Sequence, residues 1–160
     1  MNNSKKQCGC NMPTKEQNLR QNNLNQKILN IKWQRLVTEG ETCPRCSATE
    51  QELDKAIGKL KQALLPLGIE VNLEKEKLSI SEFNQAPLQS NRILINQQPL
   101  EDFIKGEIGQ SPCCDVCGPS DCRTVKINEQ IYETMPSKLI IQAGLSATSQ
   151  ILNVKRENCC

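Results

Sequence analysis

The feature that most constrains the fold is a strand-like segment followed by a cysteine pair and an amphipathic helix. Over residues 31–37, Ile31, Trp33 and Val37 share one alternating face with Arg35, and Lys32 and Gln34 lie opposite, which is typical of a β-strand. A Cys-Pro-Arg-Cys motif follows at residues 43–46, and apolar residues then recur at helical spacing up to Leu64. Pro66 ends this helix, and residues 69–73 alternate again. The sequence therefore predicts a β-α-β opening and an α/β fold.

The Cys-Pro-Arg-Cys motif is a candidate redox site. Two cysteines separated by two residues can close a small disulfide ring, and a helix N-terminus stabilises the attacking thiolate. We predict that Cys43 is the nucleophile, that Arg45 adds positive charge, and that Cys46 is the resolving thiol. A zinc knuckle is the alternative, because the same motif is common in zinc sites. Thr49 and Glu52 have the spacing of a capping box. A helix that began there would start after the motif and would stabilise the thiolate less.

A second group of cysteines lies in the C-terminal half. Cys114 and Cys117 form a Cys-x-x-Cys-Gly unit, which suits a metal-binding turn because glycine relieves the backbone where sulfurs converge. Cys113 and Cys122 lie beside this unit, and Asp121 is a further donor. Four such ligands fit zinc, another thiophilic ion or an iron–sulfur cluster. We predict a metal staple or a second dithiol here, and an inactive loop held by zinc or a disulfide is the alternative. The sequence also allows one site made of Cys43, Cys46, Cys114 and Cys117.

The two ends of the chain carry further cysteines. Residues 1–29 are crowded with Asn and Gln, and their apolar residues occur singly, so we expect a disordered tail. We expect a polar tail over residues 151–160. Closely spaced thiols on exposed chain suit Cu(I), Hg(II) or As(III), and they could also reduce a core disulfide. The tail cysteines that we predict as soft-metal ligands are Cys8, Cys10, Cys159 and Cys160.

The composition excludes several classes of function. Histidine is absent, which removes a Ser-His-Asp triad, a Cys-His pair and histidine-ligated metals. No apolar run has the length of a signal peptide or membrane span, so we expect a cytoplasmic protein with reduced thiols. The net charge of +2 and the few aromatic residues predict no nucleic-acid partner, and we expect no membrane partner. Glu101 and Asp102 are expected in a solvated turn, and residues 74–77 in an exposed turn.

The chain resembles the glutaredoxins and the wider thioredoxin-like fold in the order strand, Cys-Pro-x-Cys, amphipathic helix and second strand. From about Ile31 to Leu145 it is similar to a small prokaryotic family of glutaredoxin-like proteins of unassigned function. Thioredoxin-like enzymes place a cis-proline before the third strand, and the matching position here is Asn91. The segments that carry the resemblance are Trp33-Gln34-Arg35-Leu36, Cys43-Pro44-Arg45-Cys46, Ser90-Asn91-Arg92-Ile93-Leu94-Ile95-Asn96 and Ser111-Pro112-Cys113-Cys114-Asp115-Val116-Cys117-Gly118.

These observations together predict one domain over residues 30–150, between the two tails. We expect a thioredoxin-like sheet of about four or five strands flanked by helices, with a cysteine-rich loop over residues 111–122 after the third strand. The predicted function is cytoplasmic thiol–disulfide exchange through Cys43 and Cys46, with thiol or disulfide substrates, which would make the protein an oxidoreductase. The alternative is binding or sequestration of soft metal or metalloid ions, and the oligomeric state is left open. Further expected elements are a hairpin over residues 125–132 and a last helix that ends or weakens at Gly144.

Overall fold

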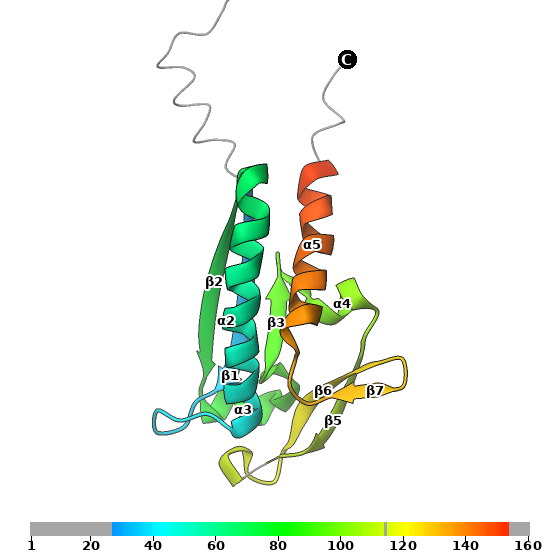
Figure 1. Cartoon of the computed structure of the whole chain (residues 1–160). Helices are drawn as coiled ribbons and strands as arrows, with labels where there is room; N and C mark the ends of the chain where they lie inside the picture. Colours follow the sequence, from blue (N-terminus) through cyan, green and yellow to red (C-terminus); the bar gives the residue numbers. More distant parts are fainter. Residues whose placement is uncertain (1–26, 114, 154–160) are drawn as a thin grey trace, which may run out of the picture.

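The protein folds into two β-sheets and two long helices (Figure 1). The computed structural model describes residues 27–113 and 115–153. The larger sheet has the strand order β2-β1-β3-β4, with β1 parallel to β2 and β3 antiparallel to both of its neighbours. The smaller sheet is antiparallel, with the order β5-β6-β7. The elements are β1 (Lys27–Leu36), α2 (Pro44–Leu64), η1 (Leu65–Leu67), β2 (Ile69–Leu78), α3 (Ile80–Gln85), η2 (Pro87–Gln89), β3 (Arg92–Ile95), β4 (Gln98–Pro99), α4 (Leu100–Ile104), β5 (Glu107–Pro112), η3 (Asp115–Cys117), β6 (Asp121–Ile127), β7 (Gln130–Tyr132) and α5 (Ser137–Asn153).

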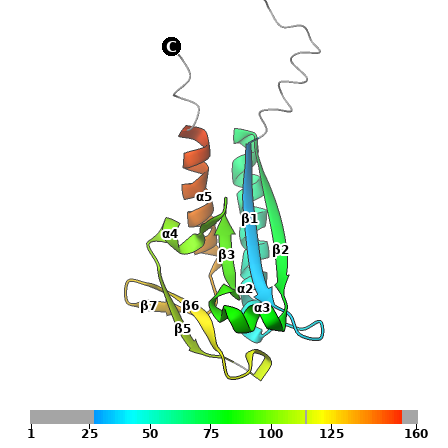
Figure 2. The same cartoon turned by 180° about the vertical axis from the view of Figure 1, so that it is seen from behind.

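The long helices α2 and α5 lie on the same face of the larger sheet, and Figure 2 shows the strands from the other side. The predicted α/β class, with a sheet flanked by helices, is confirmed, whereas the separate three-stranded sheet was not predicted. The start of β1 and the end of α5 lie at one end of the molecule, and the connection from β5 to β6 lies at the other (Figure 1). The cysteine-rich segment in this connection is therefore remote from both ends of the described chain.

Strands β1 and β2 pair along their whole length, and apolar and polar side chains alternate in β1 and over residues 69–73 of β2. The inward face of β1 includes Trp33, which is fully buried. On the polar face, Lys32 of β1 forms ion pairs with Glu74 at 3.2 Å and with Glu76 at 3.4 Å. The prediction of an exposed turn over residues 74–77 is therefore wrong. These residues continue β2, because the neighbouring strand supplies both the backbone partners and the opposite charges.

Helix α2 begins inside the Cys-Pro-Arg-Cys motif. Pro44 occupies the first turn, where its fixed φ angle suits a helix and its missing N–H is not needed. Cys43 is the N-cap residue, with φ −68° and ψ 156°. The predicted capping box is wrong: Thr49 is fully buried inside the helix, and its Oγ1 accepts a hydrogen bond from the backbone N–H of Met135 at 3.4 Å. The predicted apolar stripe is confirmed by the buried residues Leu53, Ala56, Ile57, Leu60 and Leu64.

Helix α5 continues to Asn153 and does not end or break at Gly144. A Cβ atom at Gly144 would lie 2.8 Å from Cδ1 of Leu60, a fully buried residue of α2. The missing side chain at Gly144 thus makes room for α2. This glycine is explained by helix–helix packing and not by termination of the helix.

The smaller sheet contains the predicted hairpin of β6 and β7, in which Val125 pairs with Tyr132. The cysteine-rich segment connects β5 to β6, so it follows β5 and not the third strand as predicted. Strand β5 pairs with β6 from Glu107 opposite Lys126 to Pro112 opposite Asp121. This pairing closes the cysteine-rich segment into the end of a hairpin.

Glu101 links α4 to the smaller sheet and is not in a solvated turn, which corrects the prediction from the sequence. Its carboxylate forms an ion pair with the guanidinium of Arg123 in β6, and each side chain is only 5% exposed. Arg123 also donates a hydrogen bond to the carbonyl oxygen of Leu88 at 2.8 Å. A buried carboxylate needs such a partner, and the partner lies on an element distant in the sequence. Asp102, next in the chain, is exposed as expected.

Two of the described elements extend beyond the predicted domain bounds. Strand β1 begins at Lys27 and α5 ends at Asn153, so the boundaries at residues 30 and 150 fall inside elements.

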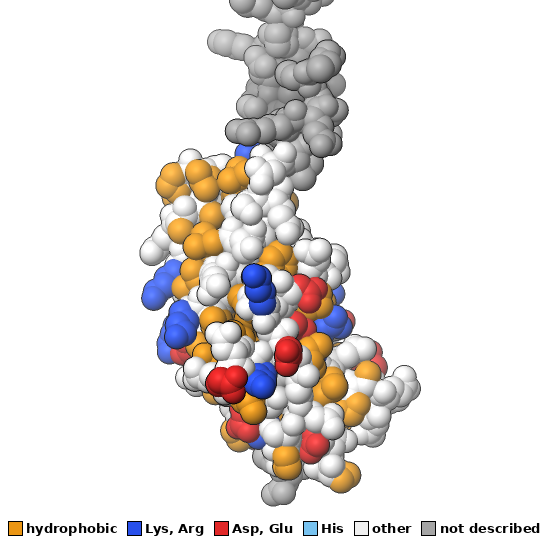
Figure 3. Space-filling view, turned by 90° about the vertical axis from the view of Figure 1, so that its right-hand side faces the viewer, with side chains coloured by type: hydrophobic (Ala, Val, Ile, Leu, Met, Phe, Trp, Pro, Cys, Tyr) orange, Lys and Arg blue, Asp and Glu red, His pale blue; other side chains and the backbone are white. Residues whose placement is uncertain are grey.

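Within the described residues, none of the helices combines the length and the hydrophobicity that crossing a membrane requires. Figure 3 shows acidic, basic and hydrophobic side chains mixed on one side of the molecule. Leu145 and Leu152 of α5 are among the exposed large hydrophobic residues.

Candidate thiol site

Cys43 and Cys46 lie at the N-terminus of α2, as predicted from the motif, and both are thiols. The Sγ atom of Cys43 accepts a hydrogen bond from the backbone N–H of Cys46 at 3.4 Å. The preceding loop is fixed to the end of β1, because the Thr42 hydroxyl donates to the carbonyl oxygen of Leu36 at 2.8 Å. Both cysteines are only 2% exposed. The two thiols of the motif are therefore buried, although Pro44 between them is exposed.

The two thiols have opposite shifts in pKa. A hydrogen bond from the Cys46 side chain is the main cause that lowers the pKa of Cys43 to about 5, and the backbone N–H groups of Cys46 and Arg45 and the Cys117 side chain add to it against the effect of burial. The pKa of Cys46 is raised, first because its thiol donates to the Cys43 thiolate and second because it is buried. Cys43 is thus the thiolate of the pair, and Cys46 retains its proton.

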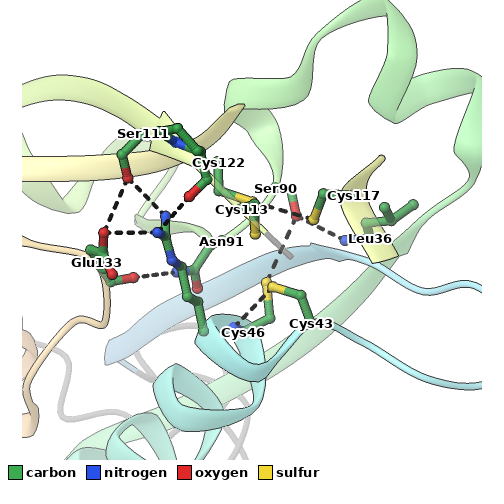
Figure 4. The surroundings of a disulfide bond; sticks show 12 residues. Leu36, Cys43, Cys46, Ser90, Asn91, Ser111, Cys113, Cys117, Cys122 and Glu133 are labelled. Carbon is green, nitrogen blue, oxygen red and sulfur yellow. Dashed lines mark hydrogen bonds and ion pairs between the residues drawn. A yellow bond between two sulfur atoms is a disulfide. The ribbon is translucent and has the colours of Figure 1, made fainter. Parts of the chain in front are cut away.

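The second cysteine group is also largely buried. Cys113 and Cys122 form a disulfide with their Cα atoms 5.4 Å apart, which closes the hairpin of β5 and β6. Cys117 lies in the short helix η3, and its Sγ atom is 3.2 Å from that of Cys122 (Figure 4). Cys114 lies outside the described residues, as do the tail cysteines Cys8, Cys10, Cys159 and Cys160.

The fold brings Cys43 to the second group. The Sγ atoms of Cys43, Cys113, Cys117 and Cys122 all lie within 4.8 Å of one another, although Cys43 and Cys113 are 70 positions apart (113 − 43). Four tetrahedral thiolates around zinc would be about 3.8 Å apart, given the usual zinc–sulfur distance. The four cysteines are therefore close enough to hold a metal ion once the disulfide is reduced. Of the shared site that the sequence allowed, Cys43 and Cys117 belong to this group of four. Cys46 lies outside the group.

Arg45 holds the two cysteine groups together. Its guanidinium donates to the Ser111 hydroxyl at 2.9 Å and to the Pro112 carbonyl oxygen at 2.7 Å, both at the end of β5. It also forms an ion pair with Glu133 at 2.7 Å (Figure 4). The motif predicted that Arg45 adds positive charge beside the thiolate. In the structure its guanidinium bonds instead to the residues just before Cys113, and it joins the start of α2 to the smaller sheet.

Ser90 is a site residue that sequence analysis did not assign. It is 2% exposed, its hydroxyl accepts a hydrogen bond from the backbone N–H of Leu36 at 3.0 Å, and its Oγ atom lies 3.8 Å from Sγ of Cys46. The available signal was its position in the segment similar to glutaredoxins. The next residue, Asn91, has a φ angle of 59° and accepts a hydrogen bond from the Trp33 indole at 3.2 Å. No peptide bond in the described parts of the chain is cis, so Asn91 does not reproduce a cis-proline turn.

Comparison with known proteins places the chain in a family. The model of a domain of unknown function, DUF2703, matches residues 29–144. The chain belongs to the DUF2703 family. An uncharacterised protein of the archaeon Archaeoglobus fulgidus is 46% identical over 112 residues, which is 70% of this chain and 82% of the relative. No solved structure matches the chain. The DUF2703 match includes both central cysteine groups and excludes the four tail cysteines, so the family is defined over the region that carries the thiol site.

Proposed function

We propose that this protein is a thiol–disulfide exchange protein in which Cys43 attacks and Cys46 resolves. The observation that carries the proposal is the geometry at the start of α2: the two buried cysteines of the motif lie side by side, and the Cys43 Sγ atom accepts a hydrogen bond from the backbone N–H of Cys46 at 3.4 Å. The lowered pKa of Cys43 and the raised pKa of Cys46 agree with a thiolate beside a thiol. The order of β1, Cys-Pro-Arg-Cys, α2 and β2 further supports a thioredoxin-like interpretation. A cytoplasmic location would suit the chemistry, since thiols stay reduced there.

The proposed reaction has two steps that balance in atoms and electrons. The Cys43 thiolate attacks one sulfur of a disulfide, and the other sulfur leaves as a thiolate. Cys46 then gives its proton to a departing thiolate and attacks the sulfur of Cys43, which releases the second half of the substrate. The products are a Cys43–Cys46 disulfide and a reduced substrate, and two electrons have moved. A second thiol such as glutathione would return the protein to the dithiol form.

The first test measures reduction of hydroxyethyl disulfide by the full chain, with glutathione as the electron donor. We expect Cys43→Ser to lower the rate to that of glutathione alone, because a hydroxyl at this position is not ionised at neutral pH. Ser47→Ala is the matched control, since Ser47 is exposed on the same turn of α2. Full activity of Cys43→Ser, or failure of the wild type to form a Cys43–Cys46 disulfide with oxidised glutathione, would refute the proposal.

The second candidate function is the binding of a soft metal or metalloid ion. The convergence of Cys43, Cys113, Cys117 and Cys122 favours it, because four thiolates suit zinc and other thiophilic ions. Native mass spectrometry of the reduced chain with Zn²⁺ tests it. One retained ion that is lost in Cys117→Ser, and kept in Ser47→Ala, would support a four-thiolate site. An ion that is lost when residues 1–26 and 154–160 are removed would assign binding to the tails instead.

A further inference from the structure

The burial of the thiol pair restricts what Cys43 can attack. Cys43 and Cys46 are each 2% exposed, and Cys117 and Cys122 are 5% and 4% exposed. A disulfide on another protein could not approach the Cys43 sulfur without opening the structure. A disulfide of the chain itself is already in contact range, because both of its sulfurs lie within 4.8 Å of the Cys43 sulfur.

We propose that the Cys43–Cys46 dithiol passes its electrons to the Cys113–Cys122 disulfide of the same chain, and that the β5–β6 connection hands them to the external substrate. This inference rests on the proposed exchange function and names its first substrate. Cys113 is the partly buried member of the group, whereas the other described sulfurs are sealed. The connection therefore has one cysteine facing the inner dithiol that is also near the surface.

The internal step is a balanced exchange between one dithiol and one disulfide. The Cys43 thiolate bonds to one sulfur of the Cys113–Cys122 disulfide, and the other sulfur leaves as a thiolate. Cys46 transfers its proton to that thiolate and then attacks the Cys43 sulfur, which frees the second sulfur. The Cys43–Cys46 pair ends as a disulfide, and Cys113 and Cys122 end as one thiol and one thiolate. The external disulfide is then reduced by the same two steps at Cys113 and Cys122.

The surrounding contacts hold this geometry. The bonds from Arg45 to Ser111 and to the Pro112 carbonyl oxygen fix the two residues before Cys113 against the turn of α2 that carries Cys43. The Cys117 sulfur lies 3.2 Å from Cys122, where a thiol can donate a hydrogen bond to a Cys122 thiolate as it departs. These contacts thus hold the two cysteine groups side by side, with the Cys43 sulfur within 4.8 Å of both sulfurs of the disulfide.

Trapping of the mixed disulfide tests the relay. Removal of the resolving thiol in Cys46→Ser should leave Cys43 bonded to Cys113 or Cys122 after oxidation with one equivalent of oxidised glutathione. Trypsin places Cys43 in peptide 36–45 and the acceptor cysteines in peptide 106–123. We expect at least tenfold more of the linked peptides in Cys46→Ser than in the wild type, where Cys46 resolves the link. Cys46→Ala serves as a second trap, and circular dichroism checks that each variant folds.

The position of the link decides the outcome. Cleavage before Asp115 and Asp121 divides the acceptor peptide into 106–114, 115–120 and 121–123, and a Cys114→Ser background leaves one cysteine in each. Linkage of Cys43 to the first or last fragment supports the relay. Linkage to the middle fragment, or no linked peptide in either trap, overturns it. If the wild type still forms the Cys43–Cys46 disulfide in that case, the exchange function stands without the relay. If it does not, the proposed function itself is refuted.

Discussion

Replacement of Cys46 by alanine or by serine should separate the causes of the low pKa of Cys43. The first cause is the hydrogen bond from the Cys46 side chain, and the backbone N–H groups of Cys46 and Arg45 add to it. Alanine removes the side-chain donor and leaves the backbone donors in place. Serine keeps a donor, because its hydroxyl can bond to the Cys43 thiolate. Alanine should therefore raise the pKa of Cys43, and serine should leave it near its wild-type value.

The size of the effect follows from the pKa. With a pKa of about 5 for Cys43, the ratio of thiolate to thiol is about 100 to one at pH 7 and about ten to one at pH 6. Burial opposes the thiolate, so loss of the largest favourable contact lets burial dominate. We expect the thiolate fraction of Cys43 at pH 6 to fall at least about threefold in Cys46→Ala.

Pulsed alkylation at a series of pH values measures this fraction, with the reagent counted on the peptide that holds Cys43. The shape of the profile is used, because burial slows alkylation at every pH alike. The wild type and Cys46→Ser should lose reactivity as the pH falls through about 5, since protonation removes the nucleophile. A wild-type midpoint above pH 8, or equal midpoints in Cys46→Ala and the wild type, would refute the assigned cause of the low pKa.

Two further predictions concern stability. Glu101→Gln should lower the free energy of unfolding by about 3–5 kcal/mol, because it leaves the Arg123 guanidinium buried without its counter-charge. Urea unfolding measures this, and Asp102→Asn, an exposed neighbour, should change stability by no more than about 0.5 kcal/mol; equal losses in the two variants would contradict the role of the ion pair. If the four-thiolate site forms, Zn²⁺ should raise the melting temperature only after reduction of Cys113–Cys122, with about 2.7 kcal/mol gained at one hundred times the dissociation constant. Equal stabilisation of the oxidised protein would exclude Cys113 and Cys122 as ligands.

The sequence alone determined the local arrangement around the first cysteine pair. The alternation in β1 and in the first half of β2, and the apolar stripe of α2, are periodic patterns of about ten to twenty residues. Such patterns predict a strand or a helix without any knowledge of distant residues. The sequence placed Cys43 and Cys46 near the start of this helix, whereas the exact N-cap at Cys43, with Pro44 in the first turn, came from the structure. The hairpin of β6 and β7 was also predictable, because its signal lies in a short local segment of the sequence.

The tertiary structure decided every feature that depends on a distant partner. From the sequence, residues 74–77 resemble a charged turn. In the structure they belong to β2, and Lys32 of the neighbouring strand forms ion pairs with Glu74 and Glu76. Glu101 was expected in a solvated turn, but its side chain is buried in an ion pair with Arg123. Gly144 was expected to end or weaken a helix, but the helix continues and Leu60 packs against it. The local sequence does not identify such partners, because strand register and side-chain packing determine which distant residues come into contact.

The same division applies to the thiol site. The spacing of the cysteines identified two groups, which the sequence allowed either as separate sites or as one shared site, and nothing in that spacing decided between the two arrangements. Their convergence depends on the pairing of β5 with β6, which folds Cys113 and Cys122 together, and on Arg45, which binds the end of β5 to the start of α2. The sequence by itself identified the cysteines that are candidates for thiol chemistry. Only the tertiary structure decided which sulfur lies next to which, because that contact joins residues from opposite halves of the chain.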